Sequence, residues 1–251
     1  EKVYRMAQLN GLIHIYQEEG MKTRKLNVEN LCKEFGGKAV LSDLAFDLYS
    51  HEIVGLVAPK GAGKTTLLKC VGLMMKPDAA LIDICGINAL QEPDRAVGKI
   101  ALLAEDPEVF ETMTGKENLE VFGMLMQADR QQMKEARAYT RLGYHLWKKV
   151  KTYSTGMKQR LGLGIALMKN PEVILLDEPT NGLEPAEAAA LWQELEALRQ
   201  EGVSILVASQ DVDELQGFAN RIFFLIDGKI VESLAEGAQT ESNPRLIKNP
   251  T

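Results

Sequence analysis

The chain has 251 residues, of which 45% are hydrophobic and 25% charged, with a formal net charge of −6. These values suit one globular α/β domain with a sizeable core, and the negative charge argues against a dedicated nucleic-acid-binding protein, which needs a basic face. No apolar run reaches the about 20 residues needed to cross a bilayer, and no secretory signal is visible. The three cysteines form no C-x-x-C pair, which fits a reducing cytosol.

The first twenty residues are expected to form an appended segment. Apolar residues recur there at helical spacing, from Val3 to Tyr16, so residues 1–19 are predicted to form an amphipathic helix.

A glycine-rich loop lies between an apolar run at residues 53–57 and an amphipathic helix that begins near Lys64. Strand, loop and helix in this order favour a phosphate-binding P-loop, although a glycine turn leading into a packed helix is the alternative. Small residues let successive backbone N–H groups surround phosphate oxygens at a helix N-terminus, where the helix dipole favours an anion. Lys64 would bind the outer phosphates and the Thr65 hydroxyl would bind Mg²⁺. The predicted nucleotide-binding residues here are Ala58 (where the pattern has Gly), Pro59, Lys60, Gly61, Ala62, Gly63, Lys64, Thr65 and Thr66.

Two adjacent acids follow a second buried strand. Residues 173–176 are Val-Ile-Leu-Leu, and Asp177 and Glu178 come next. In a chain with a P-loop, acids at the carboxyl end of a strand lie where open α/β sheets bind ligands. Asp177 is suited to hold Mg²⁺, and Glu178 to orient or deprotonate an attacking water. Without the P-loop, the better interpretation of these residues would be a strand followed by an acidic turn that ends at Pro179.

A helix between these two halves begins at residues 153–161, Tyr-Ser-Thr-Gly-Met-Lys-Gln-Arg-Leu. Ser154 is suited to cap this helix, whose free N–H groups and dipole would face whatever lies before it. The segment resembles the signature motif of ATP-binding cassette (ABC) ATPases, in the form of export-type members. The P-loop, the Asp177–Glu178 pair and residues 181–185 (Asn-Gly-Leu-Glu-Pro) match the same family in order and spacing. The resemblance runs from about residue 26 to about residue 233.

The resemblance implies a fold and a division of the chain. The fold would be α/β: a P-loop NTPase core of ABC-ATPase type with a small N-terminal antiparallel β-layer and a helical subdomain. The ATPase domain would span residues 21–233, its helical subdomain about residues 107–155, and a polar tail residues 234–251. The sequence further predicts β-layer strands at 26–31 and 40–49, helices at 115–126, 129–142, 186–200 and 212–218, and strands at 203–208, 222–226 and 229–232.

The family pattern adds residues to the predicted site. Because ABC ATPases pair head to tail, Ser154 and the Gly156 N–H would contact the γ-phosphate of ATP bound to the other subunit. Phe35 falls where the family has a ring that stacks on adenine; a core-facing Phe is the alternative. Glu105 replaces a family Gln, and its carboxylate still offers Mg²⁺ an oxygen ligand. Gln210 replaces a family His; it can donate a hydrogen bond but cannot carry charge or move a proton.

We therefore expect the ATP-binding and ATP-hydrolysing subunit of an ABC transporter, resembling bacitracin- and lantibiotic-resistance exporters. ATP and Mg²⁺ would be its cofactors. ATP would close a dimer, most simply a homodimer, and drive a separate transmembrane permease that holds the chain at the cytoplasmic face of the membrane. The alternative is a cassette with weak or no hydrolysis, acting in regulation or in a non-transport ABC assembly. The catalytic residues would be Glu178 and Gln210, and the metal ligands Thr65, Glu105 and Asp177.

Overall fold

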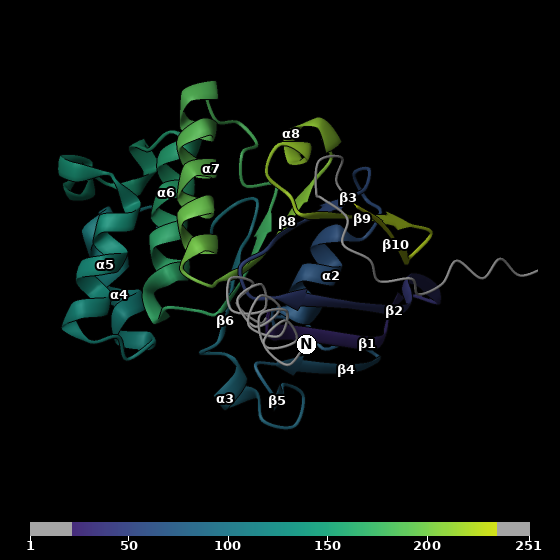
Figure 1. Cartoon of the computed structure of the whole chain (residues 1–251). Coiled ribbons are helices and arrows are strands. Elements are labelled where there is room, and N and C mark those ends of the chain that lie inside the picture. The colour runs from purple at the N-terminus through teal and green to yellow at the C-terminus, as the bar shows by residue number, and fades with distance from the viewer. Residues whose placement is uncertain (1–21, 235–251) are drawn as a thin grey trace, which may run out of the picture.

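The computed structural model describes residues 22–234 (Figure 1). The helix predicted at residues 1–19 and the tail beyond residue 234 lie outside the described residues. Strand β10 (Lys229–Leu234) includes the first residue assigned to that tail. The predicted division of the chain into an appended segment, an ATPase domain and a tail stays a prediction.

A six-stranded sheet forms the centre of the molecule, with the order β10-β9-β3-β8-β7-β6. Five of its strands run parallel and β10 is antiparallel to β9. Side chains from both faces of the parallel strands are buried, which explains why their sequences are continuous apolar runs. The parallel strands are β3 (Ile53–Val57), β6 (Ile100–Leu103), β7 (Val173–Asp177), β8 (Ser204–Ser209) and β9 (Arg221–Ile226).

A second, antiparallel sheet of four strands has the order β2-β1-β4-β5. Its strands are β1 (Arg24–Phe35), β2 (Lys38–Tyr49), β4 (Ala79–Ile84) and β5 (Ile87–Asn88). Helix α2 (Lys64–Val71) packs between this sheet and the parallel one, with Leu67 and Leu68 in the shared core (Figure 1). The predicted antiparallel β-layer is therefore present. Strands β4 and β5 were not predicted from the sequence, because these short strands are defined by pairing with β1 and with each other.

Helices cover the other face of the parallel sheet. Helix α7 (Pro185–Gln200) packs Trp192 and Leu195 into a core with Ile174 and Leu176 of β7, while Leu175 between them faces the opposite core. This alternation is the two-residue period of a strand buried on both sides. Helix α8 (Val212–Gln216) adds Leu215 to the same core.

A separate group of helices lies beside the sheets (Figure 1). Helices α4 (Gly115–Leu125) and α5 (Arg130–Thr140) each begin with a capping box, at Thr114 and at Asp129, and pack with α6 (Thr155–Ala166) around their own core. Both helices were predicted from the sequence, with slightly longer bounds. A Cβ atom at Gly164 of α6 would lie 2.6 Å from the Ala136 carbonyl oxygen, so this glycine allows α5 to approach closely. The short helices are α3 (Pro93–Ala96), η1 (Gly143–Trp147), η2 (Val150–Thr152) and η3 (Leu167–Lys169).

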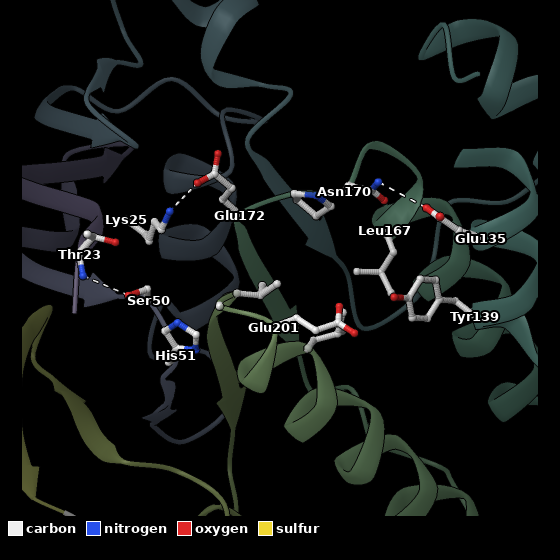
Figure 2. A pocket seen from close by; sticks show the side chains of 14 residues that line it. Thr23, Lys25, Ser50, His51, Glu135, Tyr139, Leu167, Asn170, Glu172 and Glu201 are labelled. Carbon is white, nitrogen blue, oxygen red and sulfur yellow. Dashed lines mark hydrogen bonds and ion pairs between the residues drawn. The ribbon is translucent and has the colours of Figure 1, made fainter. Parts of the chain in front are cut away.

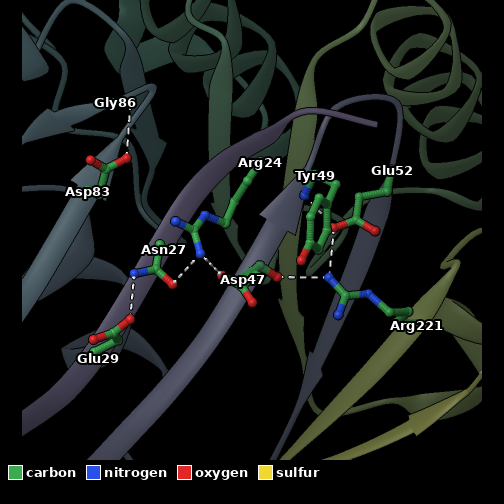
Figure 3. Close-up of polar contacts among 9 residues, drawn as sticks. All are labelled: Arg24, Asn27, Glu29, Asp47, Tyr49, Glu52, Asp83, Gly86 and Arg221. Carbon is green, nitrogen blue, oxygen red and sulfur yellow. Dashed lines mark hydrogen bonds and ion pairs between the residues drawn. The ribbon is translucent and has the colours of Figure 1, made fainter. Parts of the chain in front are cut away.

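An ion pair between Glu52 and Arg221, beside the parallel sheet, is hydrogen-bonded to the end of β2 in the other sheet (Figure 3). Glu52 is 3% exposed, and its carboxylate accepts hydrogen bonds from the Tyr49 N–H at 2.6 Å and from Arg221 Nη2 at 2.7 Å. Arg221 Nη2 also donates to the Asp47 carbonyl oxygen at 2.7 Å, and its guanidinium lies over the Phe223 ring. Arg221 therefore ties β9 to the end of β2.

We predict that Arg221→Met lowers the free energy of unfolding by about 3 kcal/mol, because it leaves the buried Glu52 carboxylate without its cation. Adding Glu52→Gln should recover much of this loss, since the double variant buries no unpaired charge. Urea unfolding gives the free energy of unfolding of both variants. The control is Arg95→Met, which breaks an exposed pair with Glu92 and should cost less than about 1 kcal/mol. Equal losses for Arg221→Met and Arg95→Met would contradict the role given to the buried pair.

Candidate functional site

The loop from Ala58 to Gly63 connects the carboxyl end of β3 to the first turn of α2. Gly61 and Gly63 have φ angles of 82° and 109°, which favour glycine. A Cβ atom at Gly63 would lie 3.0 Å from Val40 Cγ1, because β2 packs against the loop. No described side chain caps α2, and its first turn has no acid. The loop therefore presents a free, positive helix end, as an anion-binding site requires.

Lys64, the first residue of α2, points back into this loop. Its side chain is only 6% exposed, and its ammonium donates to the Ala58 carbonyl oxygen at 2.5 Å. The same ammonium lies 3.2 Å from Glu178 Oε1. A buried cation is thus held between the P-loop and the acid that follows β7.

Asp177 is the last residue of β7 and is 2% exposed. Its Oδ2 accepts a hydrogen bond from the Thr65 hydroxyl at 2.6 Å, whereas its buried Oδ1 has no hydrogen-bond partner among the described residues. Burial raises the pKa of Asp177, and the charges of Glu178 and Glu105 raise this pKa further. A buried carboxylate with one oxygen unsatisfied and other acids nearby is suited to bind a cation.

These residues fit Mg²⁺ better than a metal that needs a protein cage. Within residues 22–234, no cluster of three or more His, Cys, Asp or Glu side chains forms a metal site. Mg²⁺ is typically held by one or two carboxylates together with substrate phosphates and water. Thr65 and Asp177 provide such an incomplete ligand set at the edge of the P-loop.

Glu178 lies between the ends of β7 and β8. Its φ of 47° is in the left-handed region, an uncommon conformation for a residue other than glycine. Its carboxylate accepts a hydrogen bond from the Gln210 backbone N–H at 3.3 Å and contacts Lys64. Gln210 follows β8, and its side chain is exposed. Gln210 therefore contacts Glu178 through its backbone N–H.

Glu105 follows β6, the strand next to β7, and is linked to two motif segments. Its Oε1 accepts a hydrogen bond from Asn181 Nδ2 at 2.8 Å, and its carbonyl oxygen accepts one from Gln159 Nε2 at 2.6 Å. Asn181 and Gln159 had no predicted role. Their positions within the two family motifs were the available signal.

The remaining predicted residues lie apart from this group. Ser154 caps α6 by accepting a hydrogen bond from the Met157 N–H at 3.2 Å, and a Cβ atom at Gly156 would lie 2.7 Å from Glu187 Oε2. Phe35 is 48% exposed at the end of β1, so the alternative of a core-facing Phe is wrong. Its stacking on adenine stays a prediction. No described contact joins Phe35, Ser154 or Gly156 to the group around Lys64.

A cavity of about 820 Å³ lies at the opposite end of the parallel strands (Figure 2). Its lining includes Glu172, which precedes β7, and His51, which precedes β3. Glu172 pairs with Lys25 at 2.6 Å and with Lys99 at 2.8 Å, and these two lysines lower its pKa to about 2. The cavity is therefore separate from the P-loop, which lies at the carboxyl ends of the same strands.

The geometry around Lys64 and Asp177 defines a P-loop nucleotide-binding protein. The family model for the ABC transporter matches residues 41–181, more than half of the chain. The chain belongs to the ABC transporter family as an ATP-binding subunit, which confirms the resemblance found in the sequence. Within the part of the chain that the structure describes, no helix combines the length and apolar character needed to span a bilayer.

Comparisons with individual proteins agree with this assignment. The chain is 35% identical over 214 residues to the uncharacterized ABC transporter ATP-binding protein YhcH of Bacillus subtilis (strain 168), covering 84% of this chain and 70% of YhcH. It is 30% identical over 207 residues to the lantibiotic transport ATP-binding protein SrtF of Streptococcus pyogenes, covering 82% and 89% of the two chains. A solved ATP-binding subunit of an ABC transporter superposes with a TM-score of 0.76 at 25% identity, covering 84% of this chain and 90% of that one.

We predict that Asp177→Asn stabilises the nucleotide-free protein at about pH 8, because it removes a buried negative charge and still accepts the Thr65 hydrogen bond. Since the pKa of Asp177 is raised in the folded protein, folding favours its protonated form. The advantage of the variant should therefore shrink as the pH falls through that raised pKa. Urea unfolding at several pH values, without nucleotide, measures this difference.

Two further measurements make this test specific. Mg²⁺ with ATP should stabilise the wild-type protein more than the Asp177→Asn variant. The exposed Asp94→Asn should show neither the gain at high pH nor the loss of Mg²⁺ stabilisation. A gain from Asp177→Asn that does not change with pH would contradict the argument.

Proposed function

We propose that this chain is the ATP-hydrolysing subunit of an ABC exporter that drives a separate permease. The observation that carries the proposal is the convergence of Lys64, Thr65, Asp177 and Glu178 at the carboxyl end of the sheet. A phosphate-binding loop beside a metal-binding carboxylate and a candidate base is the arrangement that phosphoryl transfer to water requires. Mg²⁺, when bound with ATP, supplies charge that stabilises the negative phosphates.

The side chains have distinct roles in this proposal. Lys64 would exchange its contact with Glu178 for the outer phosphates, while Thr65 and Asp177 hold the metal. Glu178, released from Lys64, would orient the attacking water and accept its proton. The ion pair seen between Lys64 and Glu178 thus keeps both groups in place until nucleotide binds.

The head-to-tail dimer is supported by the position of Ser154. It lies exposed at the start of α6, where the helix presents its N-terminal end to solvent. An anion bound there would gain from the helix dipole. Because no described contact joins Ser154 to its own P-loop, we propose that the signature helix serves the ATP of a second subunit.

An apolar groove supports a permease partner. A groove of about 650 Å³ runs between β6, α4 and α6, and exposed Leu125 is part of its lining. It also includes Pro107 and Glu108, close in sequence to Glu105, so a permease segment bound here would lie near the nucleotide site. The name of SrtF refers to lantibiotic transport, and residues 105–110 resemble such exporters. The name of this relative and the resemblance of residues 105–110 support outward transport.

A cassette with slow hydrolysis is the second candidate. Gln210 replaces a family His, and the hydrogen bond that places it beside Glu178 comes from its backbone. A neutral amide cannot supply charge to the transition state. ATP binding with weak turnover would suit a regulatory role.

We predict that Glu178→Gln binds ATP but lowers hydrolysis by a factor on the order of 10²–10⁴, because it removes the proposed base and spares the phosphate loop. The trapped ATP should hold a dimer, seen by size-exclusion chromatography with and without ATP. Lys64→Ala should lose nucleotide binding, and Ser154→Arg should bind ATP as a monomer. A Glu178→Gln protein that stays monomeric with saturating ATP and hydrolyses normally would overturn the assignment.

We predict that Gln210→His raises turnover modestly, whereas Gln210→Ala lowers it, with little change in ATP affinity. One well-placed donor is worth roughly 10²–10³ in rate, and the Gln amide should already supply part of this. Phosphate release should be compared in the isolated subunit and in the complex with permease. Indifference of turnover to all three side chains in both preparations would show that Gln210 does not contact the phosphate.

A further inference from the structure

A basic and aromatic surface lies on η1 and η2, outside the site described above. We define this basic–aromatic patch as Tyr144, Trp147, Lys148, Lys149 and Lys151. Tyr144 is 67% exposed and Trp147 is 60% exposed, and the three lysines are also exposed. Neither the nucleotide site nor the groove beside α4 uses these residues.

The patch belongs to a strongly basic part of an acidic chain. Residues 141–171 contain no Asp or Glu, although the whole chain has a net charge of −6. The seven basic residues of this segment are Arg141, Lys148, Lys149, Lys151, Lys158, Arg160 and Lys169. Such a local excess of positive charge attracts an anionic surface whatever the net charge of the protein.

The nearby acids leave the three patch lysines unpaired. Glu111 pairs with Lys158, Glu120 pairs with Lys116, and Glu194 pairs with Arg141 and Arg160. Glu117 lies close enough to Lys149 for a weak electrostatic effect but forms no ion pair with it. Among the described residues, Lys148, Lys149 and Lys151 therefore have no ion-pair partner.

Buried neighbours hold the patch in a fixed shape. Leu146 and Val150 anchor the segment in the core of α4, α5 and α6. The Val150 N–H donates to the Met113 carbonyl oxygen and the Lys151 N–H to that of Glu111, both at 2.9 Å. The apolar side chains are thus turned inward, and the charged and aromatic ones are presented outward on a supported backbone.

The aromatic side chains are accompanied by cations. The Lys148 ammonium lies 5.0 Å from the Tyr144 ring centroid, and that of Lys116 lies 5.2 Å from the Trp147 ring centroid. Exposed Trp and Tyr are favoured at the boundary between lipid headgroups and acyl chains. Lysines beside them gain energy from anionic headgroups.

We propose that the basic–aromatic patch binds the surface of a membrane rich in anionic phospholipid. The three lysines would lie among headgroup phosphates, and Tyr144 and Trp147 would enter the interfacial layer. A lipid surface fits this patch better than a folded protein partner, because its side chains are exposed and line none of the three described cavities. The proposal goes beyond ATP hydrolysis and does not depend on it.

The test is co-sedimentation of the full chain, without nucleotide, with vesicles of phosphatidylglycerol and phosphatidylcholine in equal parts. We expect binding to these vesicles but not to phosphatidylcholine alone, and binding should weaken as salt rises above about 0.15 M. Replacing Lys148, Lys149 and Lys151 by Gln should lower the affinity by a factor on the order of 100, or about fivefold per lysine. The matched control replaces the exposed Lys22, Lys38 and Lys76 by Gln and should change the affinity less than about twofold.

Tryptophan fluorescence gives an independent measurement. The chain has two tryptophans: Trp147 is exposed, whereas Trp192 is buried in the core against β7. Anionic vesicles should therefore protect Trp147 from iodide quenching and shift its emission to shorter wavelength, and Trp147→Ala should remove both effects.

Three results would overturn the proposal. One is no binding to phosphatidylglycerol vesicles, and another is an equal loss of affinity in the patch and control variants. The third is unchanged vesicle binding by the patch variant with loss of binding to a co-purified permease, which would assign the patch to a protein contact. Because vesicle binding is measured without ATP, its failure is distinguishable from a failure of the proposed hydrolysis.

Discussion

The central constraint in this protein is a group of charges buried at the carboxyl end of the parallel sheet. Lys64 is the cation, and Asp177 and Glu178 are two acids at adjacent positions in the sequence. Burial makes each charge costly unless it is paired. Since Lys64 contacts Glu178 while Asp177 Oδ1 remains unsatisfied, the group has an excess of negative charge near an uncapped helix that favours anions. A nucleotide phosphate together with a divalent cation complements both halves of this arrangement.

The sheet topology explains how residues so distant in sequence form one site. Strand β3 pairs with β8 and β8 pairs with β7, all in parallel, so their carboxyl ends meet at one edge. Each following loop provides a part: the P-loop after β3, Glu178 after β7 and Gln210 after β8. The next strand, β6, brings Glu105 to the same edge, where its charge raises the pKa of Asp177. The hydrogen bonds of Glu105 to Asn181 and Gln159 connect this edge to the helices beside the sheets.

The chain has two further surfaces besides the nucleotide site: the apolar groove and the basic–aromatic patch. The groove near Glu105 is mainly apolar and lies between β6, α4 and α6, as suits a protein segment, whereas the patch on η1 and η2 is exposed and basic. Both surfaces involve the helices around α4. The groove shares the lining residue Pro171 with the ionic cavity at the amino ends of the strands, whereas the patch shares no residue with that cavity. In the proposed exporter, one region of the chain would therefore provide both the permease contact and the membrane contact.

The parts of the structure that depend on local physics were predictable from the sequence. The P-loop was predictable because glycine conformation, a buried strand and a following helix are encoded within residues 53–66. Helices α4 and α5 were also predicted, and the capping box that begins each of them lies within four consecutive residues. Which distant groups meet depends on how the folded chain packs. Strands β4 and β5 exist through pairing with β1 and with each other, the exposure of Phe35 follows from its place at the end of a β-hairpin, and the bond between Asn181 and Glu105 joins loops after neighbouring strands. Local propensity acts over a few residues, whereas burial and charge depend on neighbours that the folded chain brings together.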